Sequence, residues 1–403
     1  MTSTYYRKGF GLKSAIEGQL TSDYSSAVVD AFRASNYRLT AGPLVFRLAK
    51  EFGFCYGVDR AVDYAYETRT RFPDRKVFLV GEIIHNPHVN ERLKRMGITI
   101  LERVPDGEFD FSAISAEDVV LLPAFGVSVG DFQRLRAMGT TMVDTTCGSV
   151  LNVWKRVESY ARDGFTALIH GKVFHEETRA TASQVTSHPK GRYLVVFDMA
   201  EARQICDAIE GRGDLAALAA RFAGAASPGF DFSRDLERIG VANQTTMLAG
   251  ESLAIAREVR ESMIRRYGEA SIDDHFRSFD TICSATQDRQ DAVRHLLQEV
   301  PDLMIVVGGY NSSNTAHLAA LCREHGVRTY HIEDSEAIDL VSGRLRHQPG
   351  IQLPEEILDP GWLDHVRTIG ITAGASTPNN KIGETVIRLC AAAGVERIDG
   401  LTD

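Results

Sequence analysis

The sequence lacks the features that mark membrane, secreted and nucleic-acid-binding proteins. No apolar run approaches the length of a bilayer span, and the N-terminus, MTSTYYRKGFGLKSAIEGQL, contains no signal-peptide core. The 45 Lys and Arg are outnumbered by 54 Asp and Glu, which gives a net charge of −9, and no basic cluster is visible. We therefore expect a cytoplasmic protein that binds neither nucleic acid nor a membrane.

Cysteine is sparse and never occurs in close pairs. Six cysteines in 403 residues do not form the dense framework of a small secreted domain. They also lack the C-x-x-C spacing of zinc ribbons and of electron-carrying ferredoxins. Cys206, Cys322 and Cys390 lie in apolar, helix-like segments, where a buried and inert thiol is the ordinary interpretation.

The other three cysteines each open one copy of a repeated module. Their contexts are FCYG around Cys55, DTTCGS around Cys147 and DTICSA around Cys283. Each cysteine is followed, at nearly the same spacing, by a strand, a glycine and a polar cluster: LVGEIIHNPH (79–88), LIHGKVFHEET (168–178) and VVGGYNSSNT (306–315). A third element then ends in glycine or small hydroxyl residues: LLPAFGVS (121–128), GVANQTT (240–246) and GITAGAS (370–376). Three copies in one order indicate internal repetition.

Strand-like and helix-like segments alternate along the whole chain. Short runs rich in β-branched residues, such as VFLV and LMIVVGG, are separated by segments with helical spacing, such as DRQDAVRHLLQEV. This pattern predicts α/β modules with parallel sheets. We expect an N-terminal extension and three modules with these bounds: 1–43, 44–146 (Cys55), 147–275 (Cys147) and 276–403 (Cys283). Two insertions, 211–235 and 341–362, are predicted to be surface loops.

The three cysteines are candidate ligands of one metal centre. In open α/β sheets, ligands bind beyond the carboxyl ends of the strands, where these motifs fall. Zinc could use the three thiolates with His85 or His175 as a fourth ligand. A [4Fe–4S] cluster could use the three cysteines alone and keep one iron open for substrate. The spacing of the cysteines does not distinguish between a zinc site, a [4Fe–4S] cluster and a site without metal.

The polar clusters favour an anionic ligand. Neutral or nearly neutral donors lie beside glycines or at expected helix starts, where N–H and O–H groups hold phosphate oxygens. They are His85, His175, Thr245, Thr246, Ser312, Ser313, Asn314 and Ser376. Taken singly, several could be helix N-caps. Lys172 is the only cation inside these clusters, and Glu177 is the acid best placed to shuttle a proton.

These motifs resemble one enzyme family. The segments GFCYGVDRA, GEIIHNPHVNERL, VDTTCGSV, HGKVFHEET, NQTTM, FDTICSATQDRQDAV, VGGYNSSNT and GITAGAST occur in this order. They closely resemble 4-hydroxy-3-methylbut-2-enyl diphosphate reductase, the last enzyme of the non-mevalonate isoprenoid pathway. The resemblance covers residues 45–395. The N-terminal extension, HEETRATAS and LPAFG are similar to the longer form known from plants and cyanobacteria.

The resemblance implies a three-lobed, pseudo-threefold α/β fold around a central cluster cavity. It implies one [4Fe–4S] cluster held by Cys55, Cys147 and Cys283, with the fourth iron open. The substrate would be reduced by two electrons with loss of its hydroxyl, which gives isopentenyl and dimethylallyl diphosphate. Glu177 with Thr245 would deliver the proton. The resemblance assigns the diphosphate to His85, His175, Ser312, Asn314 and Ser376, with Ser313 nearby.

Two positions depart from the family pattern. Phe125 stands where the compact bacterial form has a histidine that touches the diphosphate, and the longer form shares this phenylalanine. Gly148 replaces a proline that is common in the family. No nicotinamide fingerprint or second cluster motif is visible, so electrons must come from a partner such as a ferredoxin or a flavodoxin.

Two other functions are compatible with these residues. One is a hydro-lyase that uses a three-cysteine [4Fe–4S] cluster only as a Lewis acid and needs no reductant. The other is a non-catalytic binding protein that holds zinc or no metal.

Overall fold

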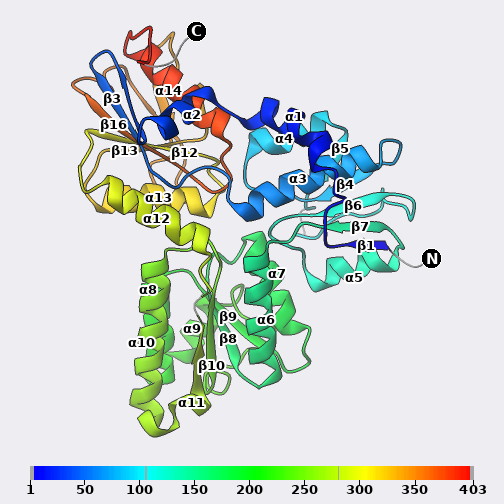
Figure 1. The fold of residues 1–403 in the computed structure, drawn as a ribbon. Coiled ribbons are helices and arrows are strands. Elements are labelled where there is room, and N and C mark those ends of the chain that lie inside the picture. Colours follow the sequence, from blue (N-terminus) through cyan, green and yellow to red (C-terminus); the bar gives the residue numbers. More distant parts are fainter. Residues whose placement is uncertain (1–3, 105–106, 280, 400–403) are drawn as a thin grey trace. The chain divides into compact units, whose positions relative to one another are not determined.

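The computed structural model describes residues 4–104, 107–279 and 281–399, and the chain divides into two compact units. Unit 1 consists of Met1–Lys8, Arg75–Gly81 and Leu101–Cys283; unit 2 consists of Gly9–Asp74, Glu82–Ile100 and Ser284–Asp403. Helices pack on parallel sheets in both (Figure 1). The predicted α/β class is confirmed. None of the described helices combines the length and the apolar character needed to cross a bilayer.

Unit 1 contains two parallel sheets. In the first, the strands β1 (Thr4–Tyr6), β7 (Thr141–Asp144), β6 (Val119–Leu122) and β4 (Val77–Val80) are neighbours in that order. In the second, the order is β11 (Phe276–Ser278), β10 (Ile239–Asn243), β8 (Thr166–His170) and β9 (Arg192–Val196). The helices are α5 (Val129–Ala137), α6 (Gly148–Arg162), α7 (Glu176–Thr186), α8 (Met199–Ile209), α9 (Leu215–Arg221), α10 (Ala249–Tyr267) and α11 (Ile272–His275).

Unit 2 contains one large sheet and a hairpin. The sheet order is β13 (Thr329–Ile332), β12 (Leu303–Val307), β16 (Thr368–Ala373), β3 (Leu44–Leu48) and β2 (Arg38–Ala41), with only β2 antiparallel. The hairpin pairs β14 (Leu345–His347) with β15 (Glu356–Leu358). The helices are α1 (Lys13–Tyr24), α2 (Ala27–Ala34), α3 (Tyr56–Arg71), α4 (Pro87–Arg95), α12 (Ser284–Leu296), α13 (Ser313–Glu324) and α14 (Asn379–Ala392). The strand β5 (Ile98–Leu101) follows α4.

The strand that leads to each cysteine pairs with a strand that belongs to the third element of a copy. β3 precedes Cys55 and pairs with β16, which runs into GITAGAS. β7 precedes Cys147 and pairs with β6, which runs into LLPAFGVS, and β11 precedes Cys283 and pairs with β10, which runs into GVANQTT. The same strand pairing therefore recurs at all three cysteines. The domain boundaries after residues 43, 146 and 275 stay a prediction.

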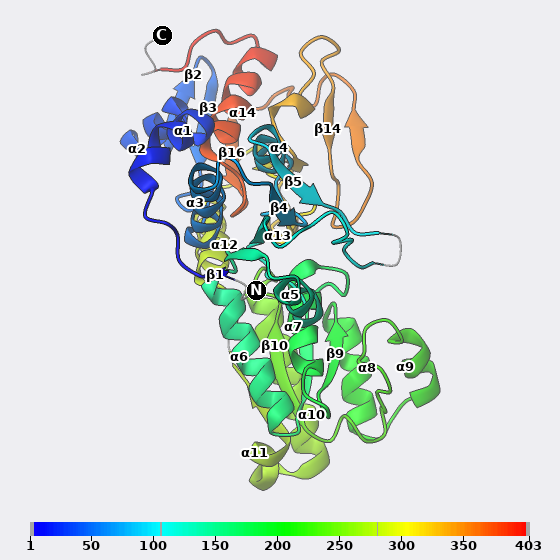
Figure 2. The ribbon, with the colours of Figure 1, turned by 90° about the vertical axis from the view of Figure 1, so that its right-hand side faces the viewer.

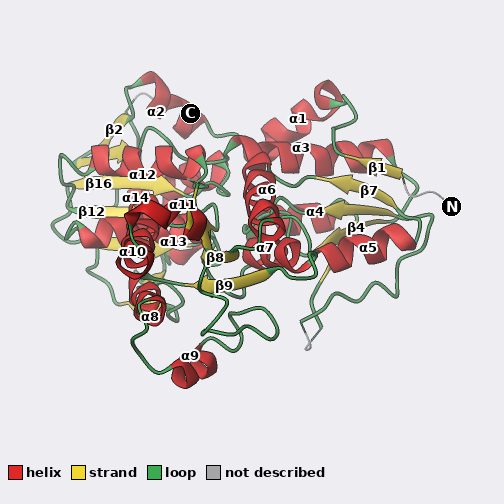
Figure 3. Cartoon of the chain, turned by 90° about the horizontal axis from the view of Figure 1, so that it is seen from below, coloured by secondary structure: helices red, strands yellow, loops and turns green. Residues whose placement is uncertain are grey.

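Alternating side chains of β12 fill two cores in unit 2. Leu303, Ile305 and Val307 pack in a cluster with residues of α2 and α14, whereas Met304 and Val306 pack with residues of α12 and α13. Successive side chains of a strand point to opposite faces, so a sheet covered on both sides needs an unbroken apolar run. Figure 3 shows β12 and β16 among these helices.

The insertion 211–235 is not simply a surface loop, and that prediction is wrong. Asp214 caps α9 by accepting hydrogen bonds from the N–H groups of Ala216 and Ala217. The Ala- and Leu-rich sequence that follows favours a helix. Phe222, at its end, is 1% exposed in the core of the second sheet of unit 1. The alanines suggested flexibility, but the apolar side chains between them are anchored in the core.

The insertion 341–362 is also more ordered than predicted. Pro349 and Pro354 lie between β14 and β15 and Pro360 lies after β15, so the prolines interrupt no strand. Trp362 is buried, and its Nε1 donates to the Gly343 carbonyl at 3.1 Å. Figure 2 shows α9 and β14, two of the three elements that the insertions add.

The described N-terminal extension contributes β1 to unit 1, and from Gly9 onward it belongs to unit 2. The Tyr66 hydroxyl on α3 donates to the Asp23 carboxylate at 2.7 Å, and Arg92 on α4 pairs with the same carboxylate at 2.8 Å. The Glu67 carboxylate accepts the N–H of Leu12 at 3.0 Å. These bonds fix α1 beside α3.

Candidate active site

The polar motif of each copy lies in a loop between a strand and a helix N-terminus. The loop after β8 ends at His175, whose Nδ1 accepts the Glu177 N–H, and the loop after β12 ends at Ser312, whose Oγ accepts the Thr315 N–H. Both residues are thus helix N-caps. In the first copy the cap is Asn86 and not His85. Unsatisfied N–H groups at helix starts make such loops suited to anions.

All three candidate ligand cysteines lie at helix N-termini. Cys55 and Cys147 are the N-cap residues of α3 and α6, and Cys283 immediately precedes α12. All three are partly exposed, and none forms a disulfide. The positive end of a helix dipole stabilises a thiolate, which is the form that binds metal.

One backbone hydrogen bond recurs at each of these cysteines. Each cysteine N–H donates to a carbonyl in the third element of another copy. The second cysteine bonds to the first copy, the third cysteine to the second copy, and the first cysteine to the third copy. The pairs are Cys147 with Ala124 (3.0 Å), Cys283 with Thr245 (3.3 Å) and Cys55 with Ala375 (3.1 Å). The repeat inferred from sequence is therefore a repeat of local structure too.

In unit 1, Glu177 is buried and bound to Thr245. Its exposed fraction is 1%. One carboxylate oxygen accepts the Thr245 N–H at 2.6 Å, and the other accepts the Thr245 hydroxyl at 3.0 Å. Because the Thr245 carbonyl accepts the Cys283 N–H, one residue connects the acid to a candidate ligand segment.

Cys147 interacts electrostatically with both Cys283 and Glu177. Burial is the main reason why the pKa of the Cys147 thiol is raised, and the Cys283 and Glu177 charges raise it further. Hydrogen bonding to Ser149 opposes the shift. Cys283 and Glu177 are both negative when ionised and therefore disfavour the Cys147 thiolate. A positive metal centre would favour it.

Phe125 contacts His175. The two rings are 5.6 Å apart between centroids and nearly perpendicular, at 80°. Because Nδ1 of His175 accepts the Glu177 N–H, a neutral His175 carries its proton on Nε2. Phe125 cannot donate to an anion, but it packs edge to face against a ring that can.

Gln244 was not predicted as a site residue. Its carbonyl oxygen accepts the Lys172 N–H at 3.0 Å and the Thr178 hydroxyl at 3.3 Å, and its amide donates to the Thr246 hydroxyl at 2.9 Å. The side chain is 1% exposed and links the loop before α7 to the loop after β10. Its place inside the NQTT motif was the available signal. Burial lowers the pKa of Lys172, the one cation of the predicted clusters.

In unit 2, one segment joins the other candidate residues. Asn314 Oδ1 accepts the Ala375 N–H at 2.9 Å, and the hydroxyl of Ser376 lies 3.1 Å from the His85 carbonyl and 3.4 Å from the hydroxyl of Ser312. The other end of the Asn314 side chain, Nδ2, is buried and has no hydrogen-bond partner. A buried, unpaired amide donor is costly and points to a missing acceptor.

The predicted residues thus form one group in each unit. Unit 1 brings together Cys147, His175, Glu177, Thr245 and Cys283. Unit 2 brings together Cys55, His85, Ser312, Asn314 and Ser376. Ser313 is the first residue of α13 and is 2% exposed. The nearby His170 is a core residue, bound to Ser252 at 2.8 Å and to the Phe197 carbonyl at 3.1 Å.

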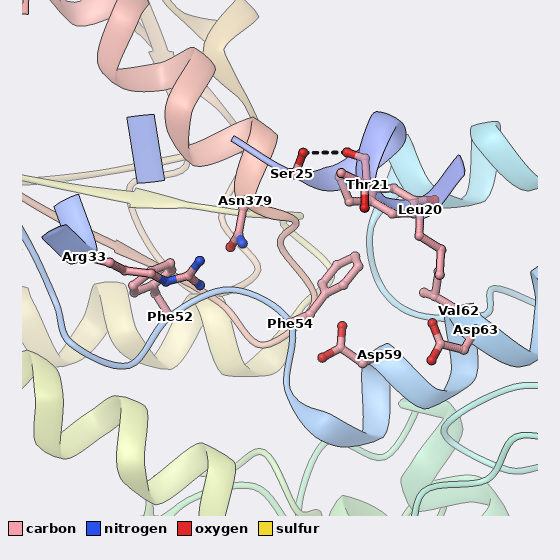
Figure 4. A pocket seen from close by; sticks show the side chains of 11 residues that line it. Leu20, Thr21, Ser25, Arg33, Phe52, Phe54, Asp59, Val62, Asp63 and Asn379 are labelled. Carbon is pink, nitrogen blue, oxygen red and sulfur yellow. Dashed lines mark hydrogen bonds between the residues drawn. The ribbon is translucent and has the colours of Figure 1, made fainter. Parts of the chain in front are cut away.

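A cavity of about 300 Å³ lies in unit 2 beside the segment that precedes Cys55 (Figure 4). It is lined by Leu20, Thr21, Tyr24, Ser25, Arg33, Phe52, Phe54, Asp59, Val62, Asp63 and Asn379. None of the predicted substrate-binding residues is among them. The cavity is therefore separate from the polar loops described above.

A family model described as "LytB protein" matches residues 46–390 of the chain. The chain belongs to the LytB family. Two curated relatives of this LytB chain are named "4-hydroxy-3-methylbut-2-enyl diphosphate reductase". The one from Thermosynechococcus vestitus is 48% identical over 98% of this chain and 97% of the relative; the one from Gloeobacter violaceus is 46% identical over 98% and 94%. These matches confirm the predicted family and the prediction of an enzyme.

Two solved structures are similar to the LytB chain. The first is titled "Structure of (E)-4-Hydroxy-3-methyl-but-2-enyl Diphosphate Reductase, the Terminal Enzyme of the Non-Mevalonate Pathway". It is 27% identical, with a TM-score of 0.51 over 85% of this chain and 98% of that chain. A reductase from Plasmodium falciparum is 20% identical, with a TM-score of 0.63 over 86% and 87%, and supports the fold alone.

We expect the six cysteines to react unequally with iodoacetamide in the metal-free protein. Burial raises the pKa of Cys206 and Cys322 to about 12 and that of Cys390 to about 11, so at pH ~8 they are almost wholly protonated. Their labelling should be slow, whereas Cys55 and Cys283, which are partly exposed, should label readily. Peptide mapping by mass spectrometry measures each rate. Rapid labelling of Cys206, Cys322 or Cys390 in folded protein would contradict the assignment.

Proposed function

We propose that this chain is a 4-hydroxy-3-methylbut-2-enyl diphosphate reductase. The substrate would take up two electrons and two protons, its allylic C–O bond would break, and the hydroxyl would leave as water. The products would be isopentenyl and dimethylallyl diphosphate. The main support for the proposal is the near full-length similarity to relatives with this name. The two groups of predicted site residues, one in each unit, also support it.

The proposal includes a [4Fe–4S] cluster on Cys55, Cys147 and Cys283. The donor set fits such a group, because the three thiols form no disulfide, are partly exposed and are located at helix N-termini. When bound, such a cluster supplies electrons and an iron with an open coordination position. The electrons would come from a ferredoxin or a flavodoxin.

The diphosphate would be held by neutral donors instead of a cationic clamp. The unpaired Nδ2 of Asn314 supplies one N–H group in unit 2, and the start of α13 supplies others. The hydroxyls of Ser312 and Ser376 and the rings of His85 and His175 add donors. Phosphate oxygens accept several such bonds at once, so the charge is stabilised without Lys or Arg.

Glu177 would move the proton that the leaving hydroxyl needs. Both of its oxygens accept hydrogen bonds from Thr245, which fix the position of the carboxyl group. The Thr245 hydroxyl, 3.0 Å from the carboxylate, can both accept and donate a proton. The pair therefore forms a two-member relay, and its burial keeps bulk water from competing for the proton.

Anaerobic purification tests the cluster, and turnover tests the reaction. We expect brown protein with a broad absorption band near 400 nm and oxidation of reduced methyl viologen only when the hydroxy-allyl diphosphate is added. Colourless protein after cluster reconstitution would exclude the reductase. Loss of the substrate hydroxyl without consumption of reductant would favour the hydro-lyase. The cytoplasmic location stays a prediction.

Serine at Cys55, Cys147 or Cys283 should each lower the iron content per chain, because each removes one thiolate of the proposed ligand set. Serine at Cys206, Cys322 or Cys390 should leave it unchanged, since these thiols are buried in apolar cores. Iron and sulfide assays on the reconstituted variants measure the difference. Iron loss in any of the second three would show that the ligand assignment is wrong.

The Glu177→Gln variant should keep its cluster and bind substrate, but its turnover should fall by roughly 10²–10⁴-fold, because an amide cannot relay a proton. The matched control is Glu176→Gln, which removes the neighbouring charge and should change turnover little. Steady-state kinetics with reduced methyl viologen compare the two. Near-normal turnover of Glu177→Gln would rule out the relay.

Changes at Asn314 should act on substrate binding. Asn314→Ala should raise KM by roughly 10- to 100-fold, the cost of one hydrogen bond to a charged group. Asn314→Asp should be worse, because it keeps the acceptor for the Ala375 N–H but turns a carboxylate oxygen toward the anion. Asn380→Ala, which removes an amide bound to the Asp23 carbonyl, is the control and should leave KM unchanged. Equal KM values for all three variants would exclude Asn314 from the diphosphate site.

A further inference from the structure

Arg289 links two segments that carry candidate cluster cysteines. It lies in the second turn of α12, and side chains of a helix lean toward its N-terminus, where Cys283 precedes Ser284. Its Nη1 donates to the carbonyl of Ala285 at 2.8 Å, and its Nη2 donates to the carbonyl of Gly53 at 2.7 Å. Ala285 follows Cys283 by two residues in the chain, and Gly53 precedes Cys55 by two.

Among the residues that the structure describes, the buried guanidinium has no ion-pair partner. Arg289 is 3% exposed, and among the described residues no carboxylate lies within ion-pair distance of it. Its third nitrogen, Nε, is buried and has no hydrogen-bond partner. Arginine does not lose its proton in proteins, so the charge persists, and a buried charge is costly unless it is paired.

Asp59 on α3 interacts electrostatically with Arg289, but the two side chains are not within ion-pair distance of each other. Asp59 lies beside Asp63, which pairs with Lys13 at 3.3 Å. Asp59 therefore does not neutralise the charge of Arg289 directly.

We propose that Arg289 is the counter-charge of the iron–sulfur cluster. This inference rests on the proposed function. A [4Fe–4S]²⁺ core bound by three thiolates carries net negative charge, and reduction by one electron makes it more negative. Net charge and hydrogen bonding around a cluster set its reduction potential. A fixed positive charge anchored to the Cys55 and Cys283 segments favours the reduced form, so it raises the potential and eases electron uptake from the external donor.

The residue type fits this role better than a purely structural one. A side chain needed only to bridge two carbonyls could be neutral, and would not impose the cost of a buried charge. Arginine is weakly hydrated and has several fixed donors, so it can bind two carbonyls and still present charge and an N–H group elsewhere. Arg289 is a positioning residue: it acts through the cluster and does not touch the reacting carbon in this proposal.

The test compares Arg289→Gln, which removes the charge, with Arg289→Lys, which keeps it. Each variant is purified anaerobically, reconstituted, and titrated with dithionite in the presence of redox mediators, with EPR of the reduced cluster as the readout. We expect the equilibrium constant for one-electron reduction to fall at least tenfold in Arg289→Gln, a shift of ~59 mV to lower potential. Arg289→Lys should retain most of the wild-type potential.

Arg323→Gln is the matched control. Arg323 on α13 is also partly buried, burial lowers its pKa, and its Nη2 donates to the carbonyl of Gln348 at 2.8 Å, but neither residue lies in a segment with a candidate cluster cysteine. Its replacement should leave the potential unchanged. A second readout is stability: Arg289→Gln should lower the unfolding midpoint of the loaded protein more than that of the metal-free protein, because the charge is unpaired when the cluster is absent.

The outcomes separate the two proposals. A wild-type chain that takes up no cluster overturns the proposed function, and this inference with it. A loaded Arg289→Gln variant with the wild-type potential overturns only the inference. If Arg289→Gln cannot be loaded, an equal loss of stability in the metal-free proteins of Arg289→Gln and Arg289→Lys would show that the residue is structural, which also overturns it.

Discussion

Negative charge held at helix N-termini is the constraint on which the candidate site depends. Cys55 and Cys147 cap α3 and α6, Cys283 precedes α12, and the polar loops end at the starts of α7 and α13. Thiolates, a carboxylate and a diphosphate all require positive surroundings. The fold supplies them mainly through backbone N–H groups, which are fixed by helix geometry and lose nothing to side-chain flexibility.

The same backbone arrangement carries different chemistry in two copies. Glu177 and Asn314 occupy equivalent places, each two residues after a helix N-cap, and each accepts the backbone N–H of the third element, from Thr245 and Ala375 respectively. The other polar atom of Glu177 is a carboxylate oxygen that accepts a hydrogen bond from the Thr245 hydroxyl. The other polar atom of Asn314 is an amide nitrogen without a hydrogen-bond partner. In the proposed function, one change of side chain thus separates an acid–base group from an anion-binding group, while the hydrogen bond to the third element is kept.

Local features could be predicted from the sequence, and long-range ones could not. The β-branched runs and the segments with helical spacing predicted the alternation of strands and helices, and Ser312, one of the donors that could be an N-cap, is one. Phe222 could not be assigned to the core, because its burial depends on a sheet formed by distant segments. Arg289 was missed for the same reason, because it reaches a backbone group of another loop and composition and spacing contain no record of such contacts. Gln244 was missed although the NQTT motif offered a signal.

The pairing of β3 with β16 has a consequence for synthesis. The partners are the segments 44–48 and 368–373, so the first strand is made long before its neighbour exists. Until the C-terminal part has left the ribosome, β3 offers unpaired N–H and C=O groups and the apolar residues Leu44 and Phe46 to any other chain. Contacts so distant in sequence slow folding and prolong exposure to aggregation. Although β2 pairs with one edge of β3 early, the other edge stays open for longer than it would in a protein with three consecutive, self-contained domains.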